Sequence, residues 1–194
     1  MLKKKTIKIG FDLDGVLLYN PARNLRPITQ ILKRIVKPKS RKKTHFYFPK
    51  NRLEILIWRI VHWSSLFLAK GFEEVKELKK NDKIETFIIT SRYDCLKKDF
   101  FYWLKKMNAK NYFKSTFYNQ DNLQPHVFKE KMINKLQLDY FFEDNWDIVK
   151  HLNKKTKAKI FWISNPLDSA ISYNFKFYTL QDAVNYLKKI LKEM

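Results

Sequence analysis

The chain has few of the residues that form disulfides, tight turns or membrane spans. Its 194 residues include one cysteine, three glycines and six prolines. The lone Cys95 excludes an internal disulfide and is compatible with a reducing compartment. No apolar run reaches the roughly 18–20 residues of a membrane span, and the lysine-containing amino terminus lacks the apolar core of a signal peptide. We therefore expect a cytoplasmic protein without a transmembrane segment.

Acidic residues are also scarce, because 19 Asp and Glu stand against 40 Lys and Arg, which gives a net charge of +21. Such a field attracts polyanions, namely nucleic acid, phosphorylated metabolites or an anionic membrane surface. The same excess would follow from an AT-rich genome, since Lys, Asn, Phe, Tyr and Ile are abundant together. Both interpretations stay open. They leave nucleic acid among the candidate partners and peripheral membrane contact as the weaker candidate.

Strand-like runs alternate with helical patterns along most of the chain. Strands are expected at 7–11, 84–90, 114–118, 138–142 and 159–163, and helices at 72–80, 94–107, 125–136, 146–152 and 179–191. This alternation predicts an α/β fold, a Rossmann-like three-layer core with a parallel sheet and helices on both faces. In such sheets ligands collect at the carboxyl ends of the strands.

Residues 20–70 interrupt the alternation. Helical spacing at 28–36 and 52–69 indicates a mainly helical cap, so we assign 1–19 and 71–194 to the core. The helix at 52–69 is apolar over much of its circumference. It is interpreted as a cap helix buried against a neighbour or in a dimer interface, in preference to an interfacial helix on anionic lipid. Its His62 is interpreted as a partly buried helix residue and not as a ligand.

Two aspartates one residue apart, Asp12 and Asp14, follow the first strand in the stretch FDLDGVL. In an extended chain residues i and i+2 point the same way, so the two carboxylates would leave the strand side by side. Like charges this close raise one another's pKa unless a cation lies between them. The pair therefore favours metal or phosphoryl chemistry, and the alternative is a turn that simply contains aspartates.

Three more polar clusters occur where an α/β sheet would gather them. Thr90-Ser91-Arg92 follows the second strand, a lysine lies in the helix before the fourth strand, and Glu143-Asp144 follows the fourth strand. All can converge at one edge of the sheet. Taken alone, Thr90 and Ser91 could cap a helix, and Arg92 is either a substrate-phosphate ligand or a structural arginine.

The stretch FDLDGVL resembles the first motif of the haloacid dehalogenase superfamily, which consists mostly of phosphohydrolases and phosphotransferases. The other three clusters match the superfamily's remaining motifs in order and context. The resemblance implies that Asp12 is a nucleophile that forms an aspartyl-phosphate, and that Asp14 is the general acid and base whose backbone carbonyl binds metal. It also implies that the Thr90 hydroxyl contacts the transferring phosphoryl group, with Ser91 as a possible substitute.

The resemblance further implies a lysine and a Mg²⁺ site. Lys129 is favoured over Lys131, because the superfamily's lysine precedes apolar residues at three, four and seven positions, here Met132, Ile133 and Leu136. Asp144 is the expected direct Mg²⁺ ligand, together with Asp12, and Glu143 is expected either to bind through water or to support the direct ligands from behind.

These inferences predict a Mg²⁺-dependent phosphohydrolase that acts on a phosphate monoester. The basic and aromatic cap suits a nucleotide, a nucleic-acid end or a small phosphorylated metabolite; its residues are Arg23, Arg26, Lys33, Arg34, 37–43, His45, Phe46, Tyr47 and Arg52. One alternative is a phosphotransferase or mutase. Another is a nucleic-acid or membrane-surface binding protein built on a phosphatase-like core.

Overall fold

The computed structural model describes residues 6–19, 46–63, 65 and 67–193. Its main element is a six-stranded sheet with the order β5-β4-β1-β6-β7-β8, in which every neighbouring pair is parallel. The strands are β1 (Ile7–Phe11), β4 (Ile84–Tyr93), β5 (Ser115–Asn119), β6 (Tyr140–Glu143), β7 (Lys159–Ile163) and β8 (Lys176–Phe177). The short β8 has no counterpart among the strands expected from the sequence.

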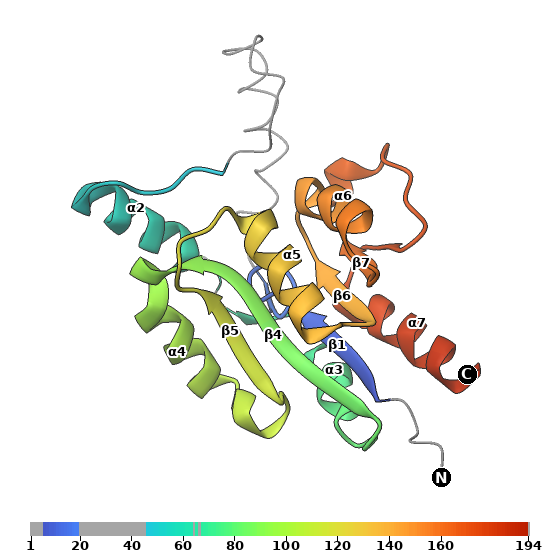
Figure 1. Ribbon diagram of the computed structural model, residues 1–194. Coiled ribbons are helices and arrows are strands. Elements are labelled where there is room, and N and C mark those ends of the chain that lie inside the picture. Colours follow the sequence, from blue (N-terminus) through green and yellow to red (C-terminus); the bar gives the residue numbers. More distant parts are fainter. Residues whose placement is uncertain (1–5, 20–45, 64, 66, 194) are drawn as a thin grey trace.

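Helices cover both faces of this sheet (Figure 1). They are α3 (Phe72–Leu78), α4 (Lys97–Lys106), α5 (Pro125–Leu136), α6 (Trp146–Lys155) and α7 (Leu180–Glu193). The apolar side chains of α5 and α6 form one buried cluster with Phe87, Ile89 and Phe141. Those of α3, α4 and α7 form the other cluster with Ile88 and Phe142. The predicted three-layer α/β fold is therefore confirmed.

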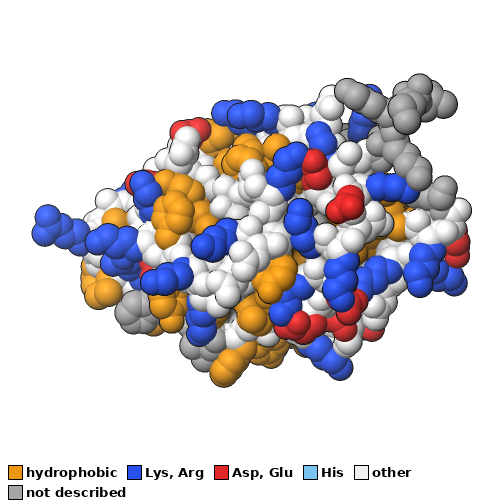
Figure 2. Space-filling model, turned by 90° about the horizontal axis from the view of Figure 1, so that it is seen from below, with side chains coloured by type: hydrophobic (Ala, Val, Ile, Leu, Met, Phe, Trp, Pro, Cys, Tyr) orange, Lys and Arg blue, Asp and Glu red, His pale blue; other side chains and the backbone are white. Residues whose placement is uncertain are grey.

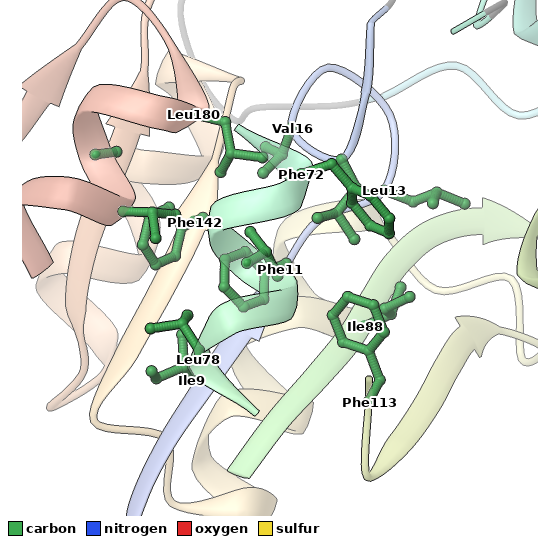
Figure 3. Packing of buried hydrophobic residues seen from close by; sticks show 14 of the residues in the cluster. Ile9, Phe11, Leu13, Val16, Phe72, Leu78, Ile88, Phe113, Phe142 and Leu180 are labelled. Carbon is green, nitrogen blue, oxygen red and sulfur yellow. The ribbon is translucent and has the colours of Figure 1, made fainter. Parts of the chain in front are cut away.

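Alternation along the strands produces these two clusters, because successive side chains of a strand point to opposite faces. Phe141 and Phe142 are both fully buried but belong to different clusters. On the side of Phe142, Phe11 stacks on that ring at 4.6 Å and packs with Ile88 and Phe113 beneath α3 (Figure 3). The central strand β1 is thus buried on both faces, which holds its carboxyl end in a fixed position.

The helix expected at 52–69 is shorter in the structure. The helix α2 (Arg52–Trp63) begins after Asn51, whose side-chain oxygen accepts a hydrogen bond from the backbone N–H of Glu54. Phe67–Leu68 forms strand β3, which pairs antiparallel with β2 (Leu18–Tyr19). The sequence pattern misled here because a short apolar run suits either a helix or a strand.

The outward face of α2 is apolar and exposed. Leu53, Leu56, Ile57 and Ile60 are each more than half exposed, so no described residue covers them. The dimer and lipid interpretations of this helix both stay predictions. Among the described residues, no helix combines the length and the apolar character that a membrane span needs.

The remaining features expected of the insertion fall on residues that are not described. The helix at 28–36, the basic run at 37–43 and the cap residues Arg23 and Arg26 all lie outside the described ranges. The boundaries of the cap at 20 and 70 therefore stay a prediction.

Candidate active site

The carboxyl ends of the neighbouring strands β1, β4 and β6 bring the expected polar residues together. The backbone N–H of Asp12 donates to the carbonyl of Phe142 at 3.0 Å, which ties the end of β1 to the end of β6. The Asp12 carboxylate in turn accepts the backbone N–H of Leu13 at 2.8 Å. The edge predicted from the sequence is therefore the edge at which these side chains meet.

Lys129 lies at the centre of one part of the site. Its Nζ is 2.8 Å from Asp12 Oδ2 and 2.5 Å from Glu143 Oε2, and its side chain is almost fully buried. It comes from α5, whose apolar residues Met132 and Ile133 pack on the sheet and so turn the lysine toward the strand ends. Lys131, two residues on, is exposed. The structure thus places Lys129, and not Lys131, beside the carboxylates.

Asp12, Glu143 and Asp144 form an acidic cluster that could hold a metal ion. Each contributes one carboxylate oxygen, and these oxygens lie within 4.8 Å of one another. All three residues are buried, and Lys129 is the ammonium that contacts two of them. Three carboxyl groups gathered beside the Lys129 ammonium form oxygen-rich surroundings of the kind that suits Mg²⁺.

The ionisation of this acidic cluster reflects its charge balance. Burial raises the pKa of Asp12 to about 8; Lys129 opposes the rise, and Glu143 and Asp144 add to it. Burial also raises the pKa of Glu143. The two carboxylates in turn raise the pKa of Lys129, although burial alone would lower it. A divalent cation would relieve the repulsion that these shifts express.

Gly15 makes room for Asp144. It has a φ of +83°, a backbone conformation that residues other than glycine rarely adopt. A Cβ atom at this position would lie 2.2 Å from Asp144 Oδ2. The glycine of the FDLDGVL stretch is therefore required both by the turn and by the close approach of a carboxylate of the acidic cluster.

Asp14 lies in different surroundings. Arg92 holds it with two hydrogen bonds, from Nε to Oδ2 at 2.8 Å and from Nη2 to Oδ1 at 2.7 Å. Ser65 Oγ donates to Oδ1 at 2.8 Å, and His62 Nδ1 lies 3.6 Å from Oδ2. Burial alone would raise the pKa of Asp14, but Arg92, with help from His62, holds that pKa well below its usual value. Asp14 is thus an ionised carboxylate paired with arginine.

No protein-family model matches the sequence of this chain, and no curated protein matches it. Solved structures do match. A putative β-phosphoglucomutase from Thermotoga maritima covers 95% of this chain and 100% of its own, with a TM-score of 0.56 at 15% identity. The putative HAD-hydrolase YfnB from Bacillus subtilis, bound to magnesium, matches over 95% of this chain and 99% of its own length, with a TM-score of 0.58 at 12% identity.

CbbY from Rhodobacter sphaeroides in complex with phosphate covers 91% of this chain and 96% of its own, with a TM-score of 0.54 at 10% identity. The chain has a haloacid dehalogenase-like fold. Identities this low establish the fold alone. The roles of the residues at the strand ends must therefore be argued from the geometry of this chain.

Within this haloacid dehalogenase-like fold, β4 is longer than expected. It extends to Tyr93, so Thr90, Ser91 and Arg92 belong to the last residues of the strand and do not follow it. The pairing with β5 shifts register between Thr90 and Tyr93, as it does at a β-bulge. Thr90 Oγ1 accepts the backbone N–H of Arg92 at 3.3 Å, and Ser91 Oγ is buried without a hydrogen bond to any described residue.

Two contacts of Asp14 were not found by sequence reasoning. His62 is partly buried, as expected, but it also reaches Asp14, and Ser65 was not singled out at all. Both lie about fifty residues from Asp14 in the chain, and a helical pattern does not reveal such a contact. A polar histidine and serine within an otherwise apolar stretch are the signal that could have indicated them.

His126 and His151 contact each other between α5 and α6, and Asp147 lies in the first turn of α6. His151 Nε2 is 2.6 Å from Glu130 Oε2, and its ring packs against that of His126 at 4.6 Å. Asn145 caps α6 by accepting the backbone N–H of Asp147. Both features agree with structural roles at the start of α6 and between α5 and α6.

Proposed function

We propose that this protein is a Mg²⁺-dependent phosphohydrolase that acts on a phosphate monoester through an aspartyl-phosphate at Asp12. The observation that carries the proposal is the acidic cluster of Asp12, Glu143 and Asp144, whose carboxylate oxygens lie within 4.8 Å of one another, with Lys129 bound to Asp12 and Glu143. The magnesium in the similar Bacillus subtilis structure and the phosphate in the similar CbbY structure support it.

Asp12, Asp144 and the backbone carbonyl of Asp14 would hold the Mg²⁺, with Glu143 binding through water. The bound ion would neutralise charge on the phosphoryl oxygens, which otherwise repel an anionic nucleophile. Lys129 orients the Asp12 carboxylate and balances the negative charge of this carboxylate while Asp12 attacks phosphorus. The Thr90 hydroxyl donates a hydrogen bond to the phosphoryl group, and Ser91 Oγ is a second donor free for this purpose among the described contacts.

Asp14 protonates the leaving oxygen and then activates water against the aspartyl-phosphate. In the structure it is ionised and paired with Arg92. A substrate phosphate competes with Asp14 for that guanidinium, because arginine binds carboxylate and phosphate in the same forked geometry. Once Arg92 turns toward the phosphate, Asp14 can take up a proton from solvent, give it to the leaving oxygen, and regain one from the water that attacks the aspartyl-phosphate.

The substrate we propose is a nucleotide, a phosphorylated nucleic-acid end or a small phosphorylated metabolite. The net charge of +21 supports a polyanionic or multiply phosphorylated ligand. A phosphotransferase or mutase would use the same residues and differ in whether water reaches the aspartyl-phosphate.

The deciding experiment is Mg²⁺-dependent hydrolysis of a panel of phosphate esters, nucleotides and phosphorylated oligonucleotide ends. Wild type is compared with Asp12→Asn, and the outward-facing Lys131→Met serves as a matched surface control. We expect turnover that needs Mg²⁺, is lost in Asp12→Asn and is unchanged in Lys131→Met. An absence of turnover throughout would contradict the proposal.

One observation favours a second candidate function, the binding of nucleic acid. A groove at the amino ends of the strands is lined by lysines, which are Lys8, Lys83, Lys154, Lys155, Lys157 and Lys159. Lysine and arginine side chains are also spread over the face seen from below, with fewer acidic ones between them (Figure 2). Binding of single-stranded oligonucleotides that weakens steeply with salt and persists in Asp12→Asn would support this candidate.

A further inference from the structure

The segment that ends α2 contacts Asp14 although it belongs to the predicted insertion. Ser65 is 1% exposed, and its hydroxyl donates to Asp14 Oδ1 at 2.8 Å. His62, in the last turn of α2, places Nδ1 at 3.6 Å from Asp14 Oδ2. Each oxygen of Asp14 therefore has one neighbour from this segment in addition to Arg92 from β4.

Backbone hydrogen bonds and a ring contact fix the positions of the His62 and Ser65 side chains. The backbone N–H of Ser65 donates to the carbonyl of His62 at 3.2 Å, which couples the two residues. The His62 ring packs edge-to-face against Trp58 at 5.9 Å. On the other side of Ser65, the N–H of Ala69 donates to the carbonyl of Leu17, in the loop that carries Asp14.

The inner and outer sides of α2 differ in a way that a purely packing role does not explain. Leu56 and Ile60 point outward and are exposed, whereas His62 and the buried Ser65 face a carboxylate. A helix that only covered the core would bury its leucines and isoleucines and leave polar groups in water. Here the half-buried His62, and Ser65 just after the helix, lie beside a carboxylate, while Ile55 and Trp58 are half-buried apolar side chains of the described part of α2.

We propose that Ser65 and His62 are positioning residues for Asp14, which makes the segment after α2 part of the catalytic unit. The inference rests on the proposed function. When a substrate phosphate engages Arg92, the contacts from Ser65 and His62 remain to orient the Asp14 carboxyl toward the leaving oxygen. Misplacement of a catalytic group by about 1 Å can lower a rate by on the order of 10²-fold, so these contacts can be measured.

The test uses the full chain and two phosphate esters. Protonation by Asp14 matters for an alkyl phosphate, whose leaving group is poor, and little for 4-nitrophenyl phosphate, whose leaving group is good. For Ser65→Ala we expect kcat for the alkyl ester to fall about 10- to 100-fold with KM little changed, and kcat for the aryl ester to fall less than about threefold. Ser172→Ala, at an exposed loop position, is the matched control and should leave both rates unchanged.

His62 provides a second, independent arm if Ser65→Ala fails to fold. His62→Asn retains a nitrogen near the position of Nδ1 and should keep most of the alkyl-ester rate, whereas His62→Leu should lose it. Equal losses on both esters, or unchanged rates on both in a folded variant, would overturn the inference. If wild-type turnover needs Mg²⁺ and Asp12, but Ser65→Ala and His62→Leu have the same rates as wild type, this inference is overturned and the proposed function stands. A wild type without activity overturns it together with the proposed function.

Discussion

Asp12 and Asp14 are two residues apart, both buried, and held in opposite electrostatic surroundings. Asp12 shares Lys129 with Glu143 and lies beside Asp144, and burial raises its pKa to about 8. Asp14 accepts two hydrogen bonds from Arg92, and its pKa is held well below the usual value. Asp12 therefore shares one buried ammonium with Glu143, whereas the Asp14 carboxylate has a guanidinium bound to both of its oxygens.

This difference separates the functions of two chemically identical side chains. A carboxylate with too little counter-charge is the one that a metal ion would stabilise, and so the one placed to attack a metal-bound substrate. A carboxylate paired with arginine is held apart from the ion and is suited to moving protons once the arginine is engaged elsewhere. Four experiments test how far the two sites are independent.

Substitution of the aspartates should produce the largest effects. Asp12→Asn removes the nucleophile and should lower kcat by about 10⁴-fold or more on every ester. Asp14→Asn removes the proton carrier and should lower kcat by about 10²- to 10⁴-fold on alkyl esters, with a smaller loss on 4-nitrophenyl phosphate. Steady-state kinetics on both esters check this. Identical profiles for the two variants would show that the aspartates do not have separate roles.

Removal of the two counter-cations should destabilise the fold but respond differently to metal. Lys129→Met and Arg92→Met each break a buried ion pair, at a cost of about 3–5 kcal/mol in the free energy of unfolding without metal. Saturating Mg²⁺ should restore much of the loss in Lys129→Met, because a cation can replace the ammonium among Asp12, Glu143 and Asp144. It should restore little in Arg92→Met, because the Asp14 carboxylate lies outside that group.

Urea unfolding in EDTA and in Mg²⁺ measures both variants. Lys131→Met is the matched control, since Lys131 is exposed on the same helix, and it should change the free energy of unfolding by no more than about 0.5 kcal/mol. If Mg²⁺ restored the free energy of unfolding equally in Lys129→Met and Arg92→Met, the surroundings of Asp12 and Asp14 would not be electrostatically separate.

Gly15→Ala should disturb the acidic cluster through backbone geometry. The new Cβ would meet Asp144 Oδ2 at 2.2 Å at a φ of +83°, so we expect a loss of about 1–3 kcal/mol in stability and weaker Mg²⁺ binding. The Mg²⁺ concentration at half-maximal thermal stabilisation provides the measurement. Unaltered Mg²⁺ affinity in a destabilised variant would remove Asp144 from the proposed ligands.

The last comparison is the pH dependence of the free energy of unfolding in EDTA. The pKa of Asp12, about 8, exceeds its unfolded value of 3.8, so folded protein retains a proton that unfolded chain has lost. Its contribution to stability is complete below about pH 4 and is lost as pH rises through 8, with a slope of at most about 1.4 kcal/mol per pH unit. Asp14, with its lowered pKa, contributes in the opposite sense: its stabilisation is present above pH 3.8 and is lost as the medium becomes more acidic.

Unfolding free energies of wild type and Asp12→Asn between about pH 5 and pH 8 check the sign. The wild type should lose stability with rising pH more steeply than the variant, in which residue 12 no longer titrates. Parallel curves would show that Asp12 is ionised in the metal-free protein.

Local patterns in the sequence determined the core of the fold. The helix at 125–136 and the strand at 159–163 have the predicted limits, since the spacing of apolar residues and a proline at the first turn are local signals. The same patterns place Asp12, Arg92 and Glu143 at strand ends. Parallel strands gather such residues at one edge, so the members of the site could be predicted before their contacts were known.

Only the tertiary structure decided which charges face which. Lys129 and Lys131 share one helix, and the packing of α5 on the sheet turns the first inward and the second outward. The opposite surroundings of Asp12 and Asp14 depend on residues from α5 and β4, and the contact of Ser65 with Asp14 spans fifty-one positions. Periodicity describes neighbours along the chain, whereas burial and counter-charge arise from segments that meet only when the sheet has formed.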